Sequence, residues 1–114
     1  MIKGIGIDVV DIARFQESVE RTPALKEKIF TPKEAQLKIS SLAARFAAKE
    51  ALVKALDARH VFDWHDVEIF NEESGKPAFL FTGALADRVQ GLTIHLTISH
   101  DAGIASAMVI IEGL

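Results

Sequence analysis

The chain of 114 residues contains no cysteine, which excludes a disulfide framework and thiolate chemistry. Long apolar runs are also missing, because Lys, Asp or Glu interrupts every stretch before it reaches membrane-spanning length. The first eight residues are typical of a strand and not of a signal peptide. A formal net charge of −3 disfavours nonspecific binding to nucleic acid. We therefore expect a cytoplasmic protein with neither a nucleic-acid partner nor a membrane partner.

Nucleotide-binding glycine motifs are absent as well. The glycines form neither a Walker-type loop nor a Rossmann motif, and the run 4–6 (GIG) is too short to count as either. No internal repeat, linker or low-complexity stretch divides the sequence. What is present is a composition that is 49% hydrophobic, which suits a compact globule or an oligomer with buried interfaces. We expect residues 1–114 to form a single domain.

Hydrophobic periodicity predicts one strand, then helices, then mostly antiparallel strands. In the first strand, Gly4 and Gly6 would allow close backbone approach. The last strand does not alternate, so we expect a helix on one face and another subunit on the other. This order predicts an α+β fold, a mostly antiparallel sheet packed against one long helix and shorter helices. The expected ranges are strands 2–10, 67–71, 78–81, 93–99 and 104–111, with helices or helical turns at 11–21, 23–28, 31–34, 41–56 and 83–90.

The most informative stretch is 41–56, which is rich in Ala and Leu and has no Gly or Pro. It predicts a helix with Ser40 or Ser41 as its N-cap. Glu50 falls inside or at the edge of its apolar stripe, which consists of Leu42, Phe46, Val53 and Leu56. A buried acid there needs a hydrogen bond, a counter-charge or a metal ion. The spacing fits a surface Glu50–Lys54 pair equally well, worth roughly 0.3–0.5 kcal/mol.

A second acid, Asp8, stands near the end of the first strand and could meet Glu50 if the helix packs over that strand. Two carboxylates with open positions suit Mg²⁺, which keeps waters and takes substrate phosphates as further ligands. Nearby cations could hold additional phosphates. On the residues alone, this combination indicates phosphoryl transfer. The candidate cations are Arg45, Lys49, Lys54 and Lys76.

The histidines fit other kinds of site less well. His60 and His65 lie in an acidic connection without a Cys or a HExxH pattern, and we interpret them as exposed side chains rather than zinc ligands. His95 alternates onto a strand face and is interpreted as structural. The Ser-His-Asp run at 99–101 contains the residue types of a catalytic triad, but three contiguous residues cannot form the relay.

Four segments, in their order along the chain, resemble the signatures of one family. The first has the opening G-x-G-x-D pattern of the holo-acyl-carrier-protein synthases, the small 4′-phosphopantetheinyl transferases. The second is similar to the family's long-helix signature, and the others resemble its third and fourth motifs. The segments are 4–11 (GIGIDVVD), 45–51 (RFAAKEA) with Lys54-Ala55 after it, 74–77 (SGKP) and 97–101 (TISHD).

The resemblance implies an enzyme that transfers the phosphopantetheine arm of coenzyme A to a serine of an acyl carrier protein or domain. Adenosine 3′,5′-bisphosphate would be released. Asp8 and Glu50 match the family's Mg²⁺ ligands, and Lys54 matches the lysine near the reacting phosphate. The positions matching those that hold the adenosine and its 3′-phosphate are Arg45, Lys76, Pro77, Ser99 and His100. The resemblance leaves the general base open.

Partners and assembly are implied in the same way. Arg14 and Arg21 match basic positions on the first helix that receive the acidic carrier, which is either free-standing or a domain of a fatty acid synthase. Family members are typically homotrimers with sites between subunits. The chain departs from the pattern at 57–60, where members usually have a Gly-containing turn, and between Phe30 and Leu42, which is short. Asp11 stands where many members have Glu.

Two other functions remain compatible with the residues. One is a non-catalytic oligomeric module that binds acidic proteins through Arg14 and Arg21, indifferent to coenzyme A and Mg²⁺. The other is a different Mg²⁺-dependent nucleotide enzyme, which would bind adenosine diphosphate as well as the 3′,5′-bisphosphate.

Overall fold

The computed structural model describes residues 1–57 and 62–114. The α+β fold expected from the sequence is confirmed, and most boundaries agree within two residues. His60 and most of the expected turn at 57–60 lie outside the described residues. In chain order the elements are β1 (Ile2–Asp11), α1 (Ile12–Arg21), α2 (Ala24–Ile29), the 3₁₀ turn η1 (Glu34–Gln36), α3 (Ile39–Leu56), the 3₁₀ turn η2 (Trp64–Asp66), β2 (Val67–Asn71), β3 (Pro77–Phe81), α4 (Gly83–Arg88), β4 (Thr93–Asp101) and β5 (Ile104–Glu112).

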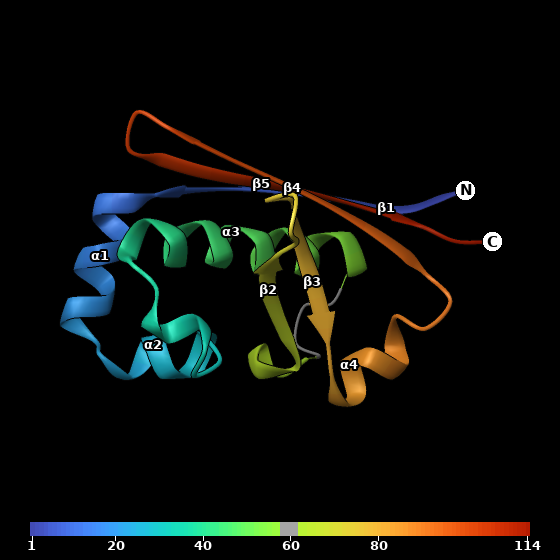
Figure 1. Cartoon of the computed structure of the whole chain (residues 1–114), viewed down its shortest axis with the longest axis horizontal. Helices are drawn as coiled ribbons and strands as arrows, with labels where there is room; N and C mark the ends of the chain where they lie inside the picture. Colours follow the sequence, from blue (N-terminus) through green and yellow to red (C-terminus); the bar gives the residue numbers. More distant parts are fainter. Residues whose placement is uncertain (58–61) are drawn as a thin grey trace.

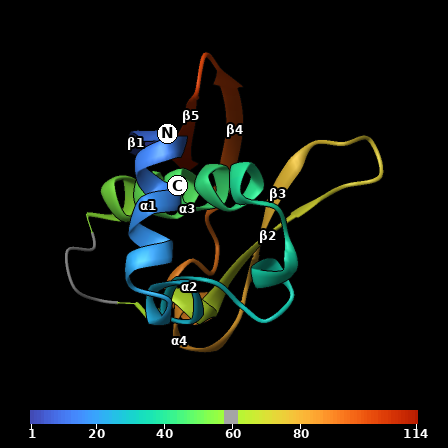
Figure 2. The same ribbon diagram turned by 90° about the vertical axis from the view of Figure 1, so that its left-hand side faces the viewer.

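The long helix α3 lies in the middle of a layered arrangement. On one side is an antiparallel sheet with strand order β1-β5-β4, and on the other are the β2-β3 hairpin and the shorter helices (Figures 1 and 2). The sheet holds the first strand of the chain next to the last. No helix of the described residues is long and apolar enough to cross a membrane.

Because α3 is covered by layers on both sides, its burial differs from the predicted single stripe. Of that stripe, Leu42 is buried, whereas Phe46, Val53 and Leu56 are only partly buried. Small side chains let backbones on both sides approach the helix, and they form most of its buried surface. The remaining buried apolar residues of α3 are Ala43, Ala44, Ala47, Ala48, Ala51, Leu52 and Ala55.

The start of α3 also differs from the prediction. Lys38, and neither Ser40 nor Ser41, is the N-cap, because its carbonyl oxygen accepts from the amides of Ser41 and Leu42. The two serines lie inside the first turn of the helix. Thr31 and Glu34 form a capping box before the long helix: Glu34 N donates to Thr31 Oγ1 at 3.3 Å, and Thr31 N donates to Glu34 Oε1 at 3.1 Å.

Glycines in β1 set how closely α3 packs on the sheet. A Cβ atom on Gly4 would lie 2.0 Å from the carbonyl oxygen of Ala55, and one on Gly6 would lie 1.9 Å from that of Ala51. Both contacts are with helix backbone, so the approach predicted from the sequence is present. The even-numbered residues of β1 face α3, and this alternation continues to Asp8, which faces the helix beyond the two glycines.

We expect Gly6→Ala to lower the free energy of unfolding by about 3 kcal/mol, since the helix backbone must move to admit the new methyl group. Urea denaturation followed by circular dichroism measures this cost. Gly75→Ala is the control, because Gly75 has no neighbouring atom within 4 Å and only a φ of +92° to oppose a side chain. That substitution should cost about 1 kcal/mol. Equal costs for the two variants would contradict the close packing of α3 on β1.

The outer face of the three-stranded sheet carries apolar side chains that no other described residue covers. Ile5, Ile7 and Val9 are 60%, 54% and 61% exposed, and Met108 on the adjacent strand β5 is 37% exposed. On the inner face, alternate residues of β5 are buried against α3. The long helix therefore covers one face of β5, as expected. The cover of the other face by a second subunit stays a prediction.

Candidate active site

Asp8 and Lys54 meet where β1 runs beneath α3. The ammonium of Lys54 donates to Asp8 Oδ1 at 3.2 Å and to the carbonyl oxygen of Ile7 at 2.8 Å. The Asp8 side chain is 18% exposed and that of Lys54 is 53% exposed, so the pair lies at the edge of the solvent. The surface Glu50–Lys54 pair considered from spacing alone is replaced by an ion pair between helix and strand.

Glu50 lies close to this pair, and its carboxyl group is electrostatically stressed. Burial raises the pKa of Glu50 above its usual value, the charge of Asp8 raises it further, and Lys54 lowers it. The structure thus brings together the two acids that the sequence proposed as partners. The ammonium of Lys54 is bonded to Asp8 alone, so the partly buried carboxylate of Glu50 has no bonded counter-charge among the described residues.

This arrangement fits a hard divalent cation. Within 1–57 and 62–114, no group of three or more His, Cys, Asp or Glu side chains could enclose a metal ion. Mg²⁺ does not require such a group, because one or two carboxylates with waters and substrate phosphates are its usual ligand set. Because the pKa of Glu50 is raised, its ionised form would be stabilised by a nearby positive charge. Asp8 and Glu50 are the residues that would hold the ion.

A cleft of about 350 Å³ opens beside the first half of α3. It contains three of the five residues that the resemblance assigns to nucleotide binding: Arg45 from α3, Pro77 from β3 and His100 from β4. Lys76 is exposed and immediately precedes Pro77. The other residues lining the cleft are Lys38, Ser40, Ser41, Ala44, Asn71, Gly75 and Ile98.

Ser99 is not part of this cleft. Side chains alternate along β4, so Ser99 points to the face opposite that of Ile98 and His100. It pairs with Ser106 of β5, which pairs in turn with Val9 of β1, and this places it on the uncovered outer face of the sheet. Within a single chain the assignment of Ser99 to nucleotide binding stays a prediction.

Arg45 is the most constrained cation in the cleft. Its Nη2 donates to Asn71 Oδ1 at 3.0 Å, and its Nε is buried without a hydrogen-bond partner in the described part of the chain. Burial lowers the pKa of Arg45, while the charges of Glu34 and Glu68 raise it. A guanidinium that lines the cleft and is held in place by one hydrogen bond is suited to binding an anion through its other Nη hydrogens.

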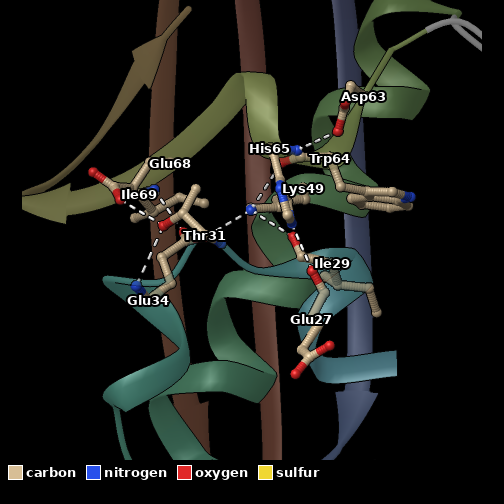
Figure 3. A network of polar contacts seen from close by, with 10 residues as sticks. All are labelled: Glu27, Ile29, Thr31, Glu34, Lys49, Asp63, Trp64, His65, Glu68 and Ile69. Atoms are coloured by element: carbon tan, nitrogen blue, oxygen red, sulfur yellow. Dashed lines mark hydrogen bonds and ion pairs between the residues drawn. The ribbon is translucent and has the colours of Figure 1, made fainter. Parts of the chain in front are cut away.

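Lys49 was named from the sequence as a possible phosphate ligand, and the structure shows that this is wrong. Its side chain is fully buried on the opposite side of α3 from β1, where its ammonium donates to Glu34 Oε1, to Ile29 O and to Trp64 O at 2.7, 2.8 and 3.2 Å (Figure 3). Glu34 Oε2 accepts from the amide of Ile69 at 2.9 Å. The ammonium has no donor left for a substrate.

The other residues named from the sequence lie outside the cleft, on α1, η2 and β4. Arg14 and Arg21 are exposed on α1, the helix whose N-cap is Asp11. His65 Nε2 lies 2.6 Å from the carbonyl oxygen of Glu27, a contact with backbone rather than with a metal-ligand cluster. His95 is paired with Glu112 at 2.6 Å, in keeping with a structural role.

Comparison with known proteins agrees with this arrangement. The sequence model of the 4′-phosphopantetheinyl transferase superfamily matches residues 4–105. A holo-[acyl-carrier-protein] synthase of Clavibacter michiganensis subsp. michiganensis is 53% identical, with 99% of this chain and 98% of that relative covered. One from Leifsonia xyli subsp. xyli is 51% identical over 98% of both.

Solved structures lead to the same group. The holo-[acyl-carrier-protein] synthase of Neisseria meningitidis superposes with a TM-score of 0.89 at 31% identity, covering 98% of this chain and 99% of that one. The synthase of Helicobacter pylori, solved in complex with coenzyme A, gives 0.84 at 33% identity, with 95% and 99% covered. The sequence match and the fold are those of a transferase of the 4′-phosphopantetheinyl class. Within that class, the chain belongs to the holo-[acyl-carrier-protein] synthase family.

Proposed function

We propose that this enzyme transfers the 4′-phosphopantetheine group of coenzyme A to a serine of an acyl carrier protein or carrier domain, with Mg²⁺, releasing adenosine 3′,5′-bisphosphate. The meeting of Asp8, Glu50 and Lys54 is the observation that carries the proposal, and the cleft lined by Arg45 and His100 is the proposed nucleotide site. We place the reaction in the cytoplasm, in fatty acid and lipid biosynthesis.

In the proposed reaction, the serine hydroxyl gives its proton to a base and its oxygen bonds to the β-phosphorus of coenzyme A. The bond from that phosphorus to the bridging oxygen breaks, and adenosine 3′,5′-bisphosphate leaves with that oxygen. Mg²⁺ held by Asp8 and Glu50 would neutralise charge on the diphosphate. Lys54, half exposed and anchored on Ile7 O, can reach a phosphoryl oxygen and stabilise the charge that develops there. Arg45 and His100 hold the adenosine 3′,5′-bisphosphate part, which lies on the leaving side.

Mass spectrometry of an apo acyl carrier protein tests the proposal directly. We expect the carrier to gain the mass of one phosphopantetheine group when the enzyme, coenzyme A and Mg²⁺ are all present. A carrier whose modified serine is replaced by alanine should not gain it, nor should a reaction with chelator. Absence of the adduct, together with binding of acidic proteins that ignores coenzyme A, would favour a non-catalytic module instead.

Carrier recognition is proposed to use α1. Arg14 and Arg21 are exposed on this helix and can contact the acidic surface of a carrier. Glu17 and Glu20 on the same helix are exposed too, so the patch is mixed in charge rather than uniformly basic. We expect Arg14→Ala to act mainly through the apparent KM for the carrier.

The assembly is proposed to be a homotrimer with sites at subunit interfaces. The apolar outer face of β1 and β5 would be covered by a neighbouring subunit, which would also bring Ser99 close to a neighbour's cleft. Val9→Lys places a charge in this face and should yield a monomer in size-exclusion chromatography with light scattering. Leu80→Lys, at an exposed apolar residue on the separate β2-β3 hairpin, should leave the assembly unchanged. A Val9→Lys trimer would contradict this interface.

A further inference from the structure

One side-chain amide joins the long helix to the hairpin turn. Arg45 Nη2 donates to Asn71 Oδ1 at 3.0 Å, and Asn71 Nδ2 donates to the carbonyl oxygen of Gly75 at 2.9 Å. Only one orientation of the amide satisfies both bonds, because a guanidinium only donates and a carbonyl oxygen only accepts. Asn71 is therefore a bridge between a cation on α3 and the backbone of the turn after β2.

The turn itself is closed by backbone hydrogen bonds. Gly75 N donates to Glu72 O at 2.7 Å, and Glu72 N donates to Lys76 O at 2.8 Å. The Asn71–Gly75 bond adds a side-chain tie across the same loop. As a result, the position of Arg45 and the position of the backbone that leads to Lys76 and Pro77 depend on one residue.

These groups meet in one cleft, and Arg45 and Asn71 also line a second, smaller pocket that contains Glu34 and Glu68. Arg45, Asn71, Gly75 and Pro77 all line the cleft of about 350 Å³, together with His100 from β4. Asn71 holds the guanidinium through Nη2, and the Nε of Arg45 is buried without a partner within 1–57 and 62–114, so an anion in the cleft would be met by the remaining Nη hydrogens. A planar cation held in this way is prepared for an anionic group.

We infer that Asn71 is a positioning residue for the anion that Arg45 binds, and that it acts through Arg45 and the turn instead of touching the reacting atoms. This inference rests on the proposed function, in which the anion is the 3′-phosphate of coenzyme A. A guanidinium already fixed by Asn71 loses less conformational freedom on binding. Asn71 thus sets how well the enzyme distinguishes coenzyme A from its 3′-dephospho form.

Calorimetric titration with coenzyme A and with 3′-dephospho-coenzyme A tests the inference without requiring turnover. We expect Asn71→Ala to raise the Kd for coenzyme A about tenfold and to change that for the dephospho form by less than about twofold. In an Arg45→Ala background, Asn71→Ala should add much less loss than it causes in the wild type, since the Arg45–Asn71 bond is already gone and only the tie to Gly75 remains. Asn71→Asp keeps an acceptor for Arg45 but neutralises its charge, and should bind coenzyme A no better than Asn71→Ala.

Gln90→Ala is the matched control, because it removes an exposed amide just after α4, away from the cleft. It should bind both co-substrates like the wild type. In turnover, Asn71→Ala should raise the KM for coenzyme A and leave kcat nearly unchanged. Equal weakening for both co-substrates would indicate a merely structural residue and overturn the inference, as would an unchanged Kd for coenzyme A. A wild type that selects coenzyme A but transfers nothing would refute the proposed function and leave the role of Asn71 standing.

Discussion

Glu50→Gln is expected to reduce phosphopantetheine transfer by at least about 100-fold while the fold remains as stable as the wild type or becomes more stable. The substitution keeps the size of the side chain and removes its charge. In the free protein that charge is costly, because burial and the neighbouring Asp8 both raise the pKa of Glu50. In the proposed complex, the same charge is a ligand for the cation that neutralises the diphosphate.

Two measurements separate the role of the Glu50 charge in transfer from its effect on stability. A steady-state transfer assay gives the loss of activity, and thermal melts with and without Mg²⁺ and coenzyme A give the stabilisation by ligand. Asp8→Asn should lose activity to a similar extent, and it also weakens the bond that Lys54 makes to the strand. Asp87→Asn, at an exposed acid on α4, should behave like the wild type. Near-normal turnover by both Glu50→Gln and Asp8→Asn would rule out the metal assignment.

The encounter of Asp8 with Glu50 could be predicted because both lie in strongly patterned elements. Gly4, Gly6 and Asp8 alternate on one face of a strand, and glycine on that face lets a helix come within contact of the backbone. An acid on an Ala-rich helix then needs a partner. This argument uses only local periodicity and the cost of burying a charge, both of which can be read from a sequence.

Other parts of the site depend on contacts that periodicity does not contain. Arg45 and Asn71 are separated by 26 residues and meet only because the hairpin packs beside α3. No sequence pattern indicates that Asn71 contacts Arg45. Likewise, the direction of Ser99 follows from the register of β4 on β5, which fixes which residues share a face. Local periodicity therefore cannot predict which residues from different layers meet in the cleft.

The prediction of Lys49 as a phosphate ligand failed for a specific reason. The position of a residue around a helix says which direction its side chain takes, but not whether another layer covers that direction. Here a second layer does: the end of α2, η1 and η2 supply the backbone and side-chain acceptors that surround the ammonium (Figure 3). The Ile69 amide of β2 donates to the other oxygen of Glu34. The capping box identified Glu34 as an acid near Thr31 but could not reveal its second partner.

The second large effect is on stability. Lys49→Met should lower the free energy of unfolding by about 3–5 kcal/mol, because it leaves Glu34 buried without its counter-ion. Adding Glu34→Gln should recover part of this loss, since the double variant no longer buries a lone charge. Lys54→Met breaks the half-exposed pair with Asp8 and should cost at most about 1 kcal/mol. Similar losses for Lys49→Met and Lys54→Met in urea denaturation would contradict the importance of the buried pair.

The pH dependence of Glu34→Gln gives an independent test of the same pair. Burial lowers the pKa of Lys49 below its usual value of 10.5, and the hydrogen bond and charge of Glu34 raise it partway back. Without that acid, the pKa of Lys49 falls further. A base with a lower pKa in the folded state carries fewer protons there than in the unfolded state, so stability rises with pH between the two values. The pH range over which stability rises is therefore wider in Glu34→Gln than in the wild type. The loss of unfolding free energy in Glu34→Gln, relative to the wild type, should therefore shrink between about pH 7 and about pH 9.5. A loss that stays constant over this range would mean that Lys49 does not depend on Glu34 to carry its charge.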